Sequence, residues 1–175
     1  RITKPREKGL TMVMDKGLSL RQVEDFLETS AAHTDIVKLG WATSYVTPNL
    51  KEKLALYKSA GIPVYFGGTL FEAFYIRGQL DDYRRVLDEY GMEGFKVASA
   101  DLTNYEMLEV LARTGKPLIC STGMSRESEI LDSVNLLRRL GVSYALLHCN
   151  STYPTPFKDV NLNYLLHLKQ ISGSV

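Results

Sequence analysis

The sequence lacks long apolar runs, a strong charge bias and a regular cysteine pattern. No apolar run approaches the roughly 20 residues of a membrane helix, and the polar segment Arg1–Gly9 shows no signal peptide. A net charge of +1 without a basic stripe gives no reason to expect nucleic-acid or membrane-surface binding. The two cysteines, Cys120 and Cys149, lie in apolar runs and are expected to be reduced core residues. We therefore expect a cytoplasmic protein.

Histidine clusters and glycine-rich fingerprints are also missing. No two of the three histidines have the spacing of a tight zinc site. His148 lies inside an apolar run, where a lone histidine is expected to be a hydrogen-bonded core residue. No glycine-rich dinucleotide fingerprint follows the first apolar run, which weakens a nucleotide-binding version of an open α/β sheet.

What the chain does contain is a regular alternation of short apolar runs and segments with helical periodicity. Apolar strands that alternate with helices predict a parallel sheet whose faces are covered. The predicted helices begin at caps such as Ser19, Thr103 and Ser125, and they end at glycines. One helical face is expected to be Leu50, Leu54 and Tyr57. The predicted strands are Leu10–Met14, Ile36–Leu39, Pro63–Phe66, Phe95–Ala98, Pro117–Cys120 and Tyr144–Cys149, and the terminating glycines are Gly61, Gly91, Gly115 and Gly141.

Two architectures fit this alternation, a (β/α)8 barrel and an open doubly wound sheet. With 175 residues the chain is long enough for one domain with a sizeable core. A complete barrel takes at least about 200 residues, so the chain is expected to hold about six βα units. It is then a piece of a barrel, a barrel completed by a partner, or an open sheet. We predict an α/β fold of (β/α)8 TIM-barrel type, as a single domain over 1–175.

Two lysines, Lys38 and Lys96, occupy equivalent positions in the second and fourth apolar runs. A lysine in such a strand either snorkels to solvent or points into the middle of the fold. In the middle it must meet a bound anion, because an unpaired buried ammonium is too costly to keep charged. Two inward lysines suggest a small, doubly charged substrate such as a phosphorylated acid. We expect them to converge on one cavity.

Polar residues follow every predicted strand, where parallel α/β folds place their active sites. Hydroxyls, amides and glycines at these ends are what a phosphate or carboxylate pocket needs. Asp15 is either a metal ligand or a helix N-cap, and Glu72 is either a metal ligand or a carboxylate favoured by a helix dipole. The residues concerned include Asp15 and Lys16, Thr43 and Ser44, Gly67, Gly68, Thr69 and Glu72, Ser99 and Asp101, Ser121–Gly123, and Asn150–Tyr153.

Residues from about 4 to 92 resemble phosphosulfolactate synthase, a family of coenzyme M biosynthesis. The segments that carry the resemblance are Gly9–Leu18, Val37–Ser44 and Val64–Glu72. The resemblance implies a (β/α)8 barrel that adds sulfite to phosphoenolpyruvate with Mg²⁺. After its fourth strand that family typically shows Glu-Val-Ser-Asp-Gly, whereas this chain departs from the pattern over Lys96–Asp101.

From about Gly94 onward the chain resembles the sialic acid (N-acetylneuraminate) synthase family. The segments that carry it are Phe95–Tyr105, Gly115–Met124 and Leu147–Pro156. This resemblance implies a (β/α)8 barrel that condenses phosphoenolpyruvate with an N-acetylated amino sugar, with Mn²⁺ as the alternative metal. It also implies that Lys96, Ser99 and Ser121 bind phosphoenolpyruvate, that Asp101 lies near the reacting carbons, that Ser151 takes a phosphoenolpyruvate-binding position and that Tyr153 contacts the sugar. The family's early strand motifs and its two metal-binding histidines have no counterpart here.

The two resemblances meet near 92–94, so the chain is interpreted as a chimera or a natural fusion, with halves 1–92 and 93–175. We hypothesise a phosphoenolpyruvate-dependent lyase or transferase, phosphosulfolactate-synthase-like, with sialic acid synthase chemistry and a non-catalytic scaffold as alternatives. Exposed sheet edges favour a homo-oligomer. The predicted catalytic residues are Lys38, Lys96 and Asp101; the substrate-binding residues are Lys16, Gly67, Gly68, Thr69, Ser99, Ser121, Ser151 and Tyr153; the metal ligands are Asp15 and Glu72.

Overall fold

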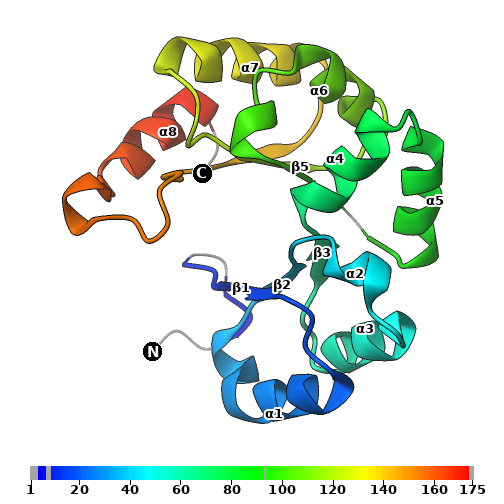
Figure 1. Cartoon of the computed structure of the whole chain (residues 1–175). Helices are drawn as coiled ribbons and strands as arrows, with labels where there is room; N and C mark the ends of the chain where they lie inside the picture. The colour runs from blue at the N-terminus through cyan, green and yellow to red at the C-terminus, as the bar shows by residue number, and fades with distance from the viewer. Residues whose placement is uncertain (1–3, 7–8, 93, 174–175) are drawn as a thin grey trace. The chain divides into compact units, whose positions relative to one another are not determined.

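The computed structural model describes residues 4–6, 9–92 and 94–173. The chain divides into two compact units, Arg1–Glu93 and Gly94–Val175. Each unit is built on a three-stranded parallel sheet with helices after its strands (Figure 1). The predicted division into halves 1–92 and 93–175 stays a prediction about the origin of the chain. The prediction of a single domain over 1–175 stays a prediction.

The sheet of the first unit has the order β1-β2-β3. Its strands are β1 Met12–Asp15, β2 Ile36–Leu39 and β3 Val64–Phe66. Met14 pairs with Lys38, and Lys38 pairs with Tyr65, so these three side chains share one face. The opposite face is the core face, where Val37, Leu39 and Phe66 are at most 1% exposed.

The helices of the first unit cover that core face, as α1 and α3 do in Figure 1. Helix α1 begins at the predicted cap, because Ser19 Oγ accepts the Gln22 N–H while the Gln22 side chain accepts the Ser19 N–H. The elements are α1 Leu20–Ser30, the 3₁₀ turn η1 Ala31–His33, α2 Thr43–Val46, α3 Leu50–Ser59, α4 Gly68–Ile76 and α5 Leu80–Glu89.

The second unit repeats the plan with the order β4-β5-β6. The core face of its sheet carries Phe95, Val97, Leu118 and Cys120, all at most 1% exposed. Helices α6 and α7 lie along this sheet in Figure 1. The elements are β4 Phe95–Val97, η2 Ser99–Asp101, α6 Tyr105–Ala112, β5 Leu118–Ser121, α7 Glu127–Arg139, β6 Tyr144–Leu147, η3 Phe157–Asp159 and α8 Tyr164–Ser172.

All six predicted strands are present, with bounds that move by no more than two residues. Each predicted terminating glycine has a positive φ, between 65° and 72°, as glycine after a helix commonly does. Two predicted caps are wrong. Asn104, rather than Thr103, caps α6 because its Oδ1 accepts the Met107 N–H. At α7 the N-cap is Arg126 rather than Ser125, and the Glu129 carboxylate accepts the Arg126 N–H.

The buried face of α3 also includes a residue that the sequence did not predict. Lys53 is 1% exposed and takes the place between Leu50 and Tyr57 in the buried stripe, while Leu54 is only half-buried. No helix in the described part of the chain is long and apolar enough to cross a membrane.

Candidate functional site

Polar side chains gather at the carboxyl ends of the three strands of the second unit. We call them the strand-end cluster, and they lie in the loops after β4, β5 and β6 or in the last residues of those strands. The cluster consists of Lys96, Ser99, Ser121, Gly123, Cys149 and Ser151.

Lys96 provides the positive charge of the cluster. It lies in register with Ile119 of β5, on the face opposite to the core residues Phe95 and Val97. The side chain is 8% exposed. Its Nζ donates to Ser121 Oγ and to the Val97 carbonyl oxygen, each at 2.6 Å. These two neutral oxygens fix the position of the ammonium group at the strand end.

Ser121 connects Lys96 with the loop after β6. Its Oγ accepts a hydrogen bond from Lys96 at 2.6 Å and another from Cys149 Sγ at 3.3 Å. A hydroxyl has two acceptor positions and one O–H donor. Because both acceptor positions are used, the remaining hydrogen-bonding capacity of Ser121 is its O–H donor.

Gly123 brings the three loops together through its backbone. Its N–H donates to Ser99 Oγ at 3.2 Å, and its carbonyl accepts from Ser151 Oγ at 3.3 Å. A Cβ at this position would lie 2.7 Å from the Cys149 carbonyl oxygen. The approach of Cys149 therefore requires glycine here, so Ser121–Gly123 is more than an ordinary turn between a strand and a helix.

Asp101 ends the 3₁₀ turn η2 that follows β4. Its backbone N–H donates to the Ala98 carbonyl at 3.1 Å. Within the described residues its Oδ2 atom is buried without a hydrogen-bond partner. The carboxylate therefore keeps an acceptor for a ligand or a water molecule. Its predicted catalytic role stays a prediction.

Tyr153 lies outside the cluster, with 87% of its surface exposed. His148 has the predicted hydrogen bond, between Nε2 and the Val160 carbonyl at 3.0 Å. Both cysteines are free thiols. Burial raises the pKa of Cys120 to about 12, although the charge of Lys96 opposes the shift. Cys120 is therefore a neutral core thiol, as the sequence predicts.

In the first unit, Lys38 lies half-buried on the face that it shares with Met14 and Tyr65. This face is opposite to the core face of the sheet. Lys16 is exposed just after β1. The prediction that Lys38 and Lys96 line one cavity stays a prediction, because each lysine is described within its own unit.

The glycine segment after β3 forms the turn into α4. Gly67 is the N-cap residue, and its N–H donates to the Leu39 carbonyl at 2.9 Å. Gly68 is the first residue of the helix and Thr69, which follows, is exposed. Glu72 lies half-buried one turn later in α4. The predicted binding roles of these residues are not tested by the geometry.

Asp15 belongs to a buried network that the sequence did not predict. Its Oδ1 accepts the N–H groups of Gly17 and Leu18 at 2.7 and 2.8 Å. Its Oδ2 accepts the Lys53 ammonium at 2.7 Å and the Tyr57 hydroxyl at 3.0 Å. Asp15 and Lys53 are both 1% exposed. Burial, together with the Asp15 charge, raises the pKa of Tyr57, so the hydroxyl stays a donor.

This network bears on both predictions for Asp15. The prediction of a helix N-cap is wrong, because Ser19 caps α1. A metal ion would have to displace one of the four donors that Asp15 already binds. Across the described residues, no group of three or more His, Cys, Asp or Glu side chains could hold a metal ion. The described residues therefore do not fit a metal centre by themselves. Metal roles for Asp15 and Glu72 stay predictions.

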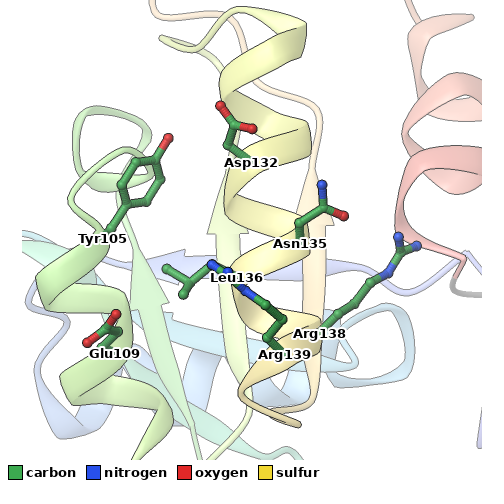
Figure 2. Close-up of a pocket in the computed structure, with 7 residues that line it drawn as sticks. All are labelled: Tyr105, Glu109, Asp132, Asn135, Leu136, Arg138 and Arg139. Atoms are coloured by element: carbon green, nitrogen blue, oxygen red, sulfur yellow. The ribbon is translucent and has the colours of Figure 1, made fainter.

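A groove of about 770 Å³ lies on the helices of the second unit. In Figure 2, Tyr105 and Glu109 come from α6 and face residues of α7 that include Asp132 and Arg139. Arg138 also lines the groove, and it donates to the Ile171 carbonyl at 2.8 Å. The lining contains both charge signs and none of the strand-end cluster, so we assign the groove no catalytic role.

Two family models match this chain. The model of (2R)-phospho-3-sulfolactate synthase (ComA) matches residues 1–120, and the model of the NeuB family matches residues 81–174. Both matches extend beyond the predicted join, and they overlap over 81–120. The overlap contains β4 with Lys96, Ser99 and Asp101.

Two curated relatives come from the two families. The chain is 40% identical over 111 residues to the phosphosulfolactate synthase of Methanocaldococcus jannaschii. The alignment covers 61% of this chain and 44% of that protein. It is 39% identical over 87 residues to the N,N'-diacetyllegionaminic acid synthase of Campylobacter jejuni, which covers 48% of this chain and 26% of that protein. The chain thus spans less than half the length of either relative.

A solved structure shows the fold. The spore coat polysaccharide biosynthesis protein of Bacillus subtilis aligns with a TM-score of 0.70 at 18% identity, covering 94% of this chain and 51% of that chain. The fold class is the predicted (β/α)8 TIM-barrel type, of which the described residues contain six strands in two parallel three-stranded sheets. The chain belongs to the (2R)-phospho-3-sulfolactate synthase (ComA) family over residues 1–120 and to the NeuB family over residues 81–174.

Proposed function

We propose that this chain binds phosphoenolpyruvate at the strand-end cluster and is the substrate-binding part of a phosphosulfolactate-synthase-like enzyme. The observation that carries the proposal is the Lys96–Ser121 pair, a buried ammonium 2.6 Å from a hydroxyl at the carboxyl ends of β4 and β5. The carboxyl end of a parallel sheet is where α/β folds bind their ligands.

The chemistry of the cluster suits an anion. Lys96 supplies a charge-assisted donor, which makes shorter and stronger hydrogen bonds to phosphate or carboxylate than a neutral donor does. Ser121 adds its O–H as a donor. Both acceptor positions of its hydroxyl oxygen are already used inside the protein. A phosphate or carboxylate oxygen accepts from both groups, so the cluster binds an acid and selects against a neutral analogue.

The family overlap supports the choice of phosphoenolpyruvate among anions. Both families use this substrate, by the resemblances stated from the sequence, although they join it to different second substrates. The region that both models match contains Lys96 and Ser99. The chain departs from the phosphosulfolactate synthase pattern over Lys96–Asp101, so the assignment of Lys96 and Ser99 to phosphoenolpyruvate comes from the sialic acid synthase resemblance. Sulfite addition is the first choice of reaction because the ComA match is the longer one.

A second candidate is condensation of phosphoenolpyruvate with an N-acetylated amino sugar. The specific observation in its favour is that the NeuB match contains the whole strand-end cluster, whereas the ComA match ends at residue 120. Ser121, Gly123, Cys149 and Ser151 all lie beyond that end. By the sequence resemblance Tyr153 would contact the sugar, and its exposed position suits a second substrate that arrives from solvent.

Calorimetric titration with phosphoenolpyruvate tests binding. Lys96→Met removes the ammonium and keeps most of the side-chain volume, so we expect at least a tenfold loss of affinity. Lys158→Met changes an exposed lysine of the same unit and serves as the matched control, with affinity within about twofold of the unchanged chain. Thermal melting of both variants shows whether the fold is intact.

The result that would overturn the proposal is a folded chain that takes up no phosphoenolpyruvate with Mg²⁺ or Mn²⁺ present. Equal affinities in the Lys96→Met and Lys158→Met variants would place the ligand elsewhere. Absence of binding would favour the interpretation of a non-catalytic scaffold.

Phosphorus NMR separates the two reactions. Sulfite addition leaves the phosphate on the organic product, as the name phospho-3-sulfolactate states. Condensation joins C3 of phosphoenolpyruvate to the aldehyde carbon of the sugar; water adds to C2, and the bond from C2 to the phosphate oxygen breaks, which releases inorganic phosphate. We expect sulfite to convert the phosphoenolpyruvate signal into a new organic phosphate signal. Inorganic phosphate that appears only with N-acetylmannosamine would establish the second candidate instead.

A further inference from the structure

A cavity of about 160 Å³ lies within the first unit, apart from any residue assigned to the strand-end cluster. Its lining comes from β3 and from helices α2, α3, α4 and α5. The lining residues that matter here are Ser44, Leu50, Phe66, Leu70, Glu89 and Tyr90.

The base of the cavity is apolar and its mouth is polar. Leu50, Phe66 and Leu70 are between 1% and 7% exposed and form the base. Tyr90 packs its ring edge-on to Phe66 at a centroid distance of 6.0 Å and is half-buried. Glu89 is exposed at the mouth. The cavity therefore has an entry path and an apolar interior, as small-molecule sites do.

Ser44 is the polar group of the interior. It is 5% exposed and lines the cavity. Among the described residues its Oγ atom is buried with no hydrogen-bond partner. A buried hydroxyl without a partner carries a desolvation penalty of about 1–3 kcal/mol. A ligand with one hydrogen-bonding group would remove that penalty and leave the rest of its surface against the apolar base.

The charge at the mouth limits the ligand to uncharged molecules. The Glu89 carboxylate is 2.9 Å from Lys51 Nζ, and Lys51 lies 5.9 Å from the centre of the Tyr90 ring. A cationic ligand would compete with Lys51 for Glu89, and an anionic ligand would approach the carboxylate directly. Neither charge finds a partner in the apolar base, where an unpaired ion is costly.

We propose that this cavity binds a small, uncharged ring compound that carries one hydroxyl, with the hydroxyl on Ser44 and the ring between Leu50, Phe66 and Leu70. The size fits, since an apolar cavity of about 150 Å³ accommodates benzene. All the lining residues belong to the first unit. The proposal therefore does not rest on phosphoenolpyruvate binding in the second unit.

The test uses phenol and toluene as probes on the full ¹⁵N-labelled chain. Titration followed by amide NMR is expected to shift the resonances of Ser44 and Leu70 with phenol, with a dissociation constant of about 1 mM or below. Toluene, which has the ring without the hydroxyl, is expected to bind the same site about tenfold more weakly because it leaves Ser44 unpaired. Benzoate is expected not to shift these resonances.

Ser44→Ala isolates the contribution of the hydroxyl. In this variant phenol is expected to lose about tenfold in affinity, so that phenol and toluene bind about equally. Ser59→Ala is the matched control, because Ser59 lies exposed in α3 and donates only to the Leu56 carbonyl. The control is expected to keep the preference for phenol.

Three results would each overturn the proposal. The first is a folded chain whose Ser44 and Leu70 resonances do not move with phenol, which would mean that bound water alone satisfies Ser44. The second is an unchanged preference for phenol in Ser44→Ala. The third is a phenol-induced shift confined to other residues. The titrations with phenol and toluene use the unsubstituted chain. They therefore test the proposal even where Ser44→Ala fails to fold.

Discussion

The two units each contain a buried lysine, and the two lysines meet different chemistry. Lys53 of the first unit is 2.7 Å from the Asp15 carboxylate. Lys96 of the second unit donates to a hydroxyl and to a backbone carbonyl. Lys53 is 1% exposed and comes from helix α3, whereas Lys96 is 8% exposed and comes from strand β4. Burial alone therefore does not distinguish the environments of these two lysines.

The difference lies in the partners and in the place on the fold. A carboxylate partner neutralises the ammonium inside the protein, so Lys53 has a structural role. A hydroxyl and a carbonyl orient the ammonium at the edge where ligands bind in parallel folds. The buried lysine of the first unit thus has a structural ion pair, whereas the lysine of the second unit has the proposed role in binding substrate.

The largest expected effect is on the stability of the first unit. Lys53→Met leaves the Asp15 carboxylate buried without its cation, and we expect a loss of about 3–5 kcal/mol in the free energy of unfolding. Urea denaturation measures it. Lys58→Met, an exposed change on the same helix, is expected to stay within about 0.5 kcal/mol. A cost below about 1 kcal/mol for Lys53→Met would remove the basis of the comparison.

A smaller effect is expected from alanine at the glycines that follow the strands. Gly123→Ala would bring a Cβ to 2.7 Å from the Cys149 carbonyl oxygen, whereas Gly67→Ala would bring one to 3.1 Å from the Leu39 carbonyl oxygen. We expect Gly123→Ala to cost about 1–3 kcal/mol and Gly67→Ala to cost less. Denaturation of the two variants gives the order, and the reverse order would contradict the close approach at the strand-end cluster.

Ser121→Ala should distinguish ligand binding from stability. It removes the acceptor of both Lys96 and Cys149, which we expect to cost about 1–2 kcal/mol in stability and about tenfold in phosphoenolpyruvate affinity. Ser128→Ala, an exposed change in α7, is the control and should alter neither quantity. A stability loss with unchanged affinity would make Ser121 a purely structural residue. The partners of Lys96 would then be structural, as those of Lys53 are.

The smallest effect concerns pH and the first unit alone. Arg6 pairs with Asp35 at 2.7 Å, and Thr11 donates its N–H to the same carboxylate. Burial opposes ionisation, but these hydrogen bonds and the Arg6 charge outweigh it, so the pKa of Asp35 lies below its ordinary value of 3.8. The stabilisation is present above that value and is lost as the pH falls through the lowered pKa.

Asp35→Asn is therefore expected to be less stable than the unsubstituted chain at pH 7, with a difference that shrinks below pH 3.8. Urea midpoints across the acid range measure it. A difference that grows on acidification would contradict the sign. The second unit should show no change in phosphoenolpyruvate affinity.

Periodicity predicts the fold well because six apolar runs alternate with helices, and glycine can end a helix at little conformational cost. Periodicity does not predict the burial of Lys53, because the buried face of α3 is predicted from apolar residues alone. The signal was available: Lys53 lies three residues after Leu50 and four before Tyr57 on one helical face. A buried charge is invisible to such a pattern until its partner, Asp15, is brought near by the fold.

The strand-end cluster was partly predictable for the same reason. Lys96, Ser99, Ser121 and Ser151 follow strands, and parallel pairing brings strand ends together. Cys149 was assigned to the core, because nothing in an apolar run indicates that its thiol donates to Ser121. Ser44 was named only as one polar strand-end residue, since the cavity it lines is made by residues far apart in the chain.

The backbone of Gly123 holds Ser99 by its N–H and Ser151 by its carbonyl, so the loops after three successive strands share one anchor. A segment that carries all three strands also carries every contact of that anchor. Recombination could therefore move this segment from one barrel to another with all of these hydrogen bonds intact. No contact of the anchor would have to form anew across the point of recombination.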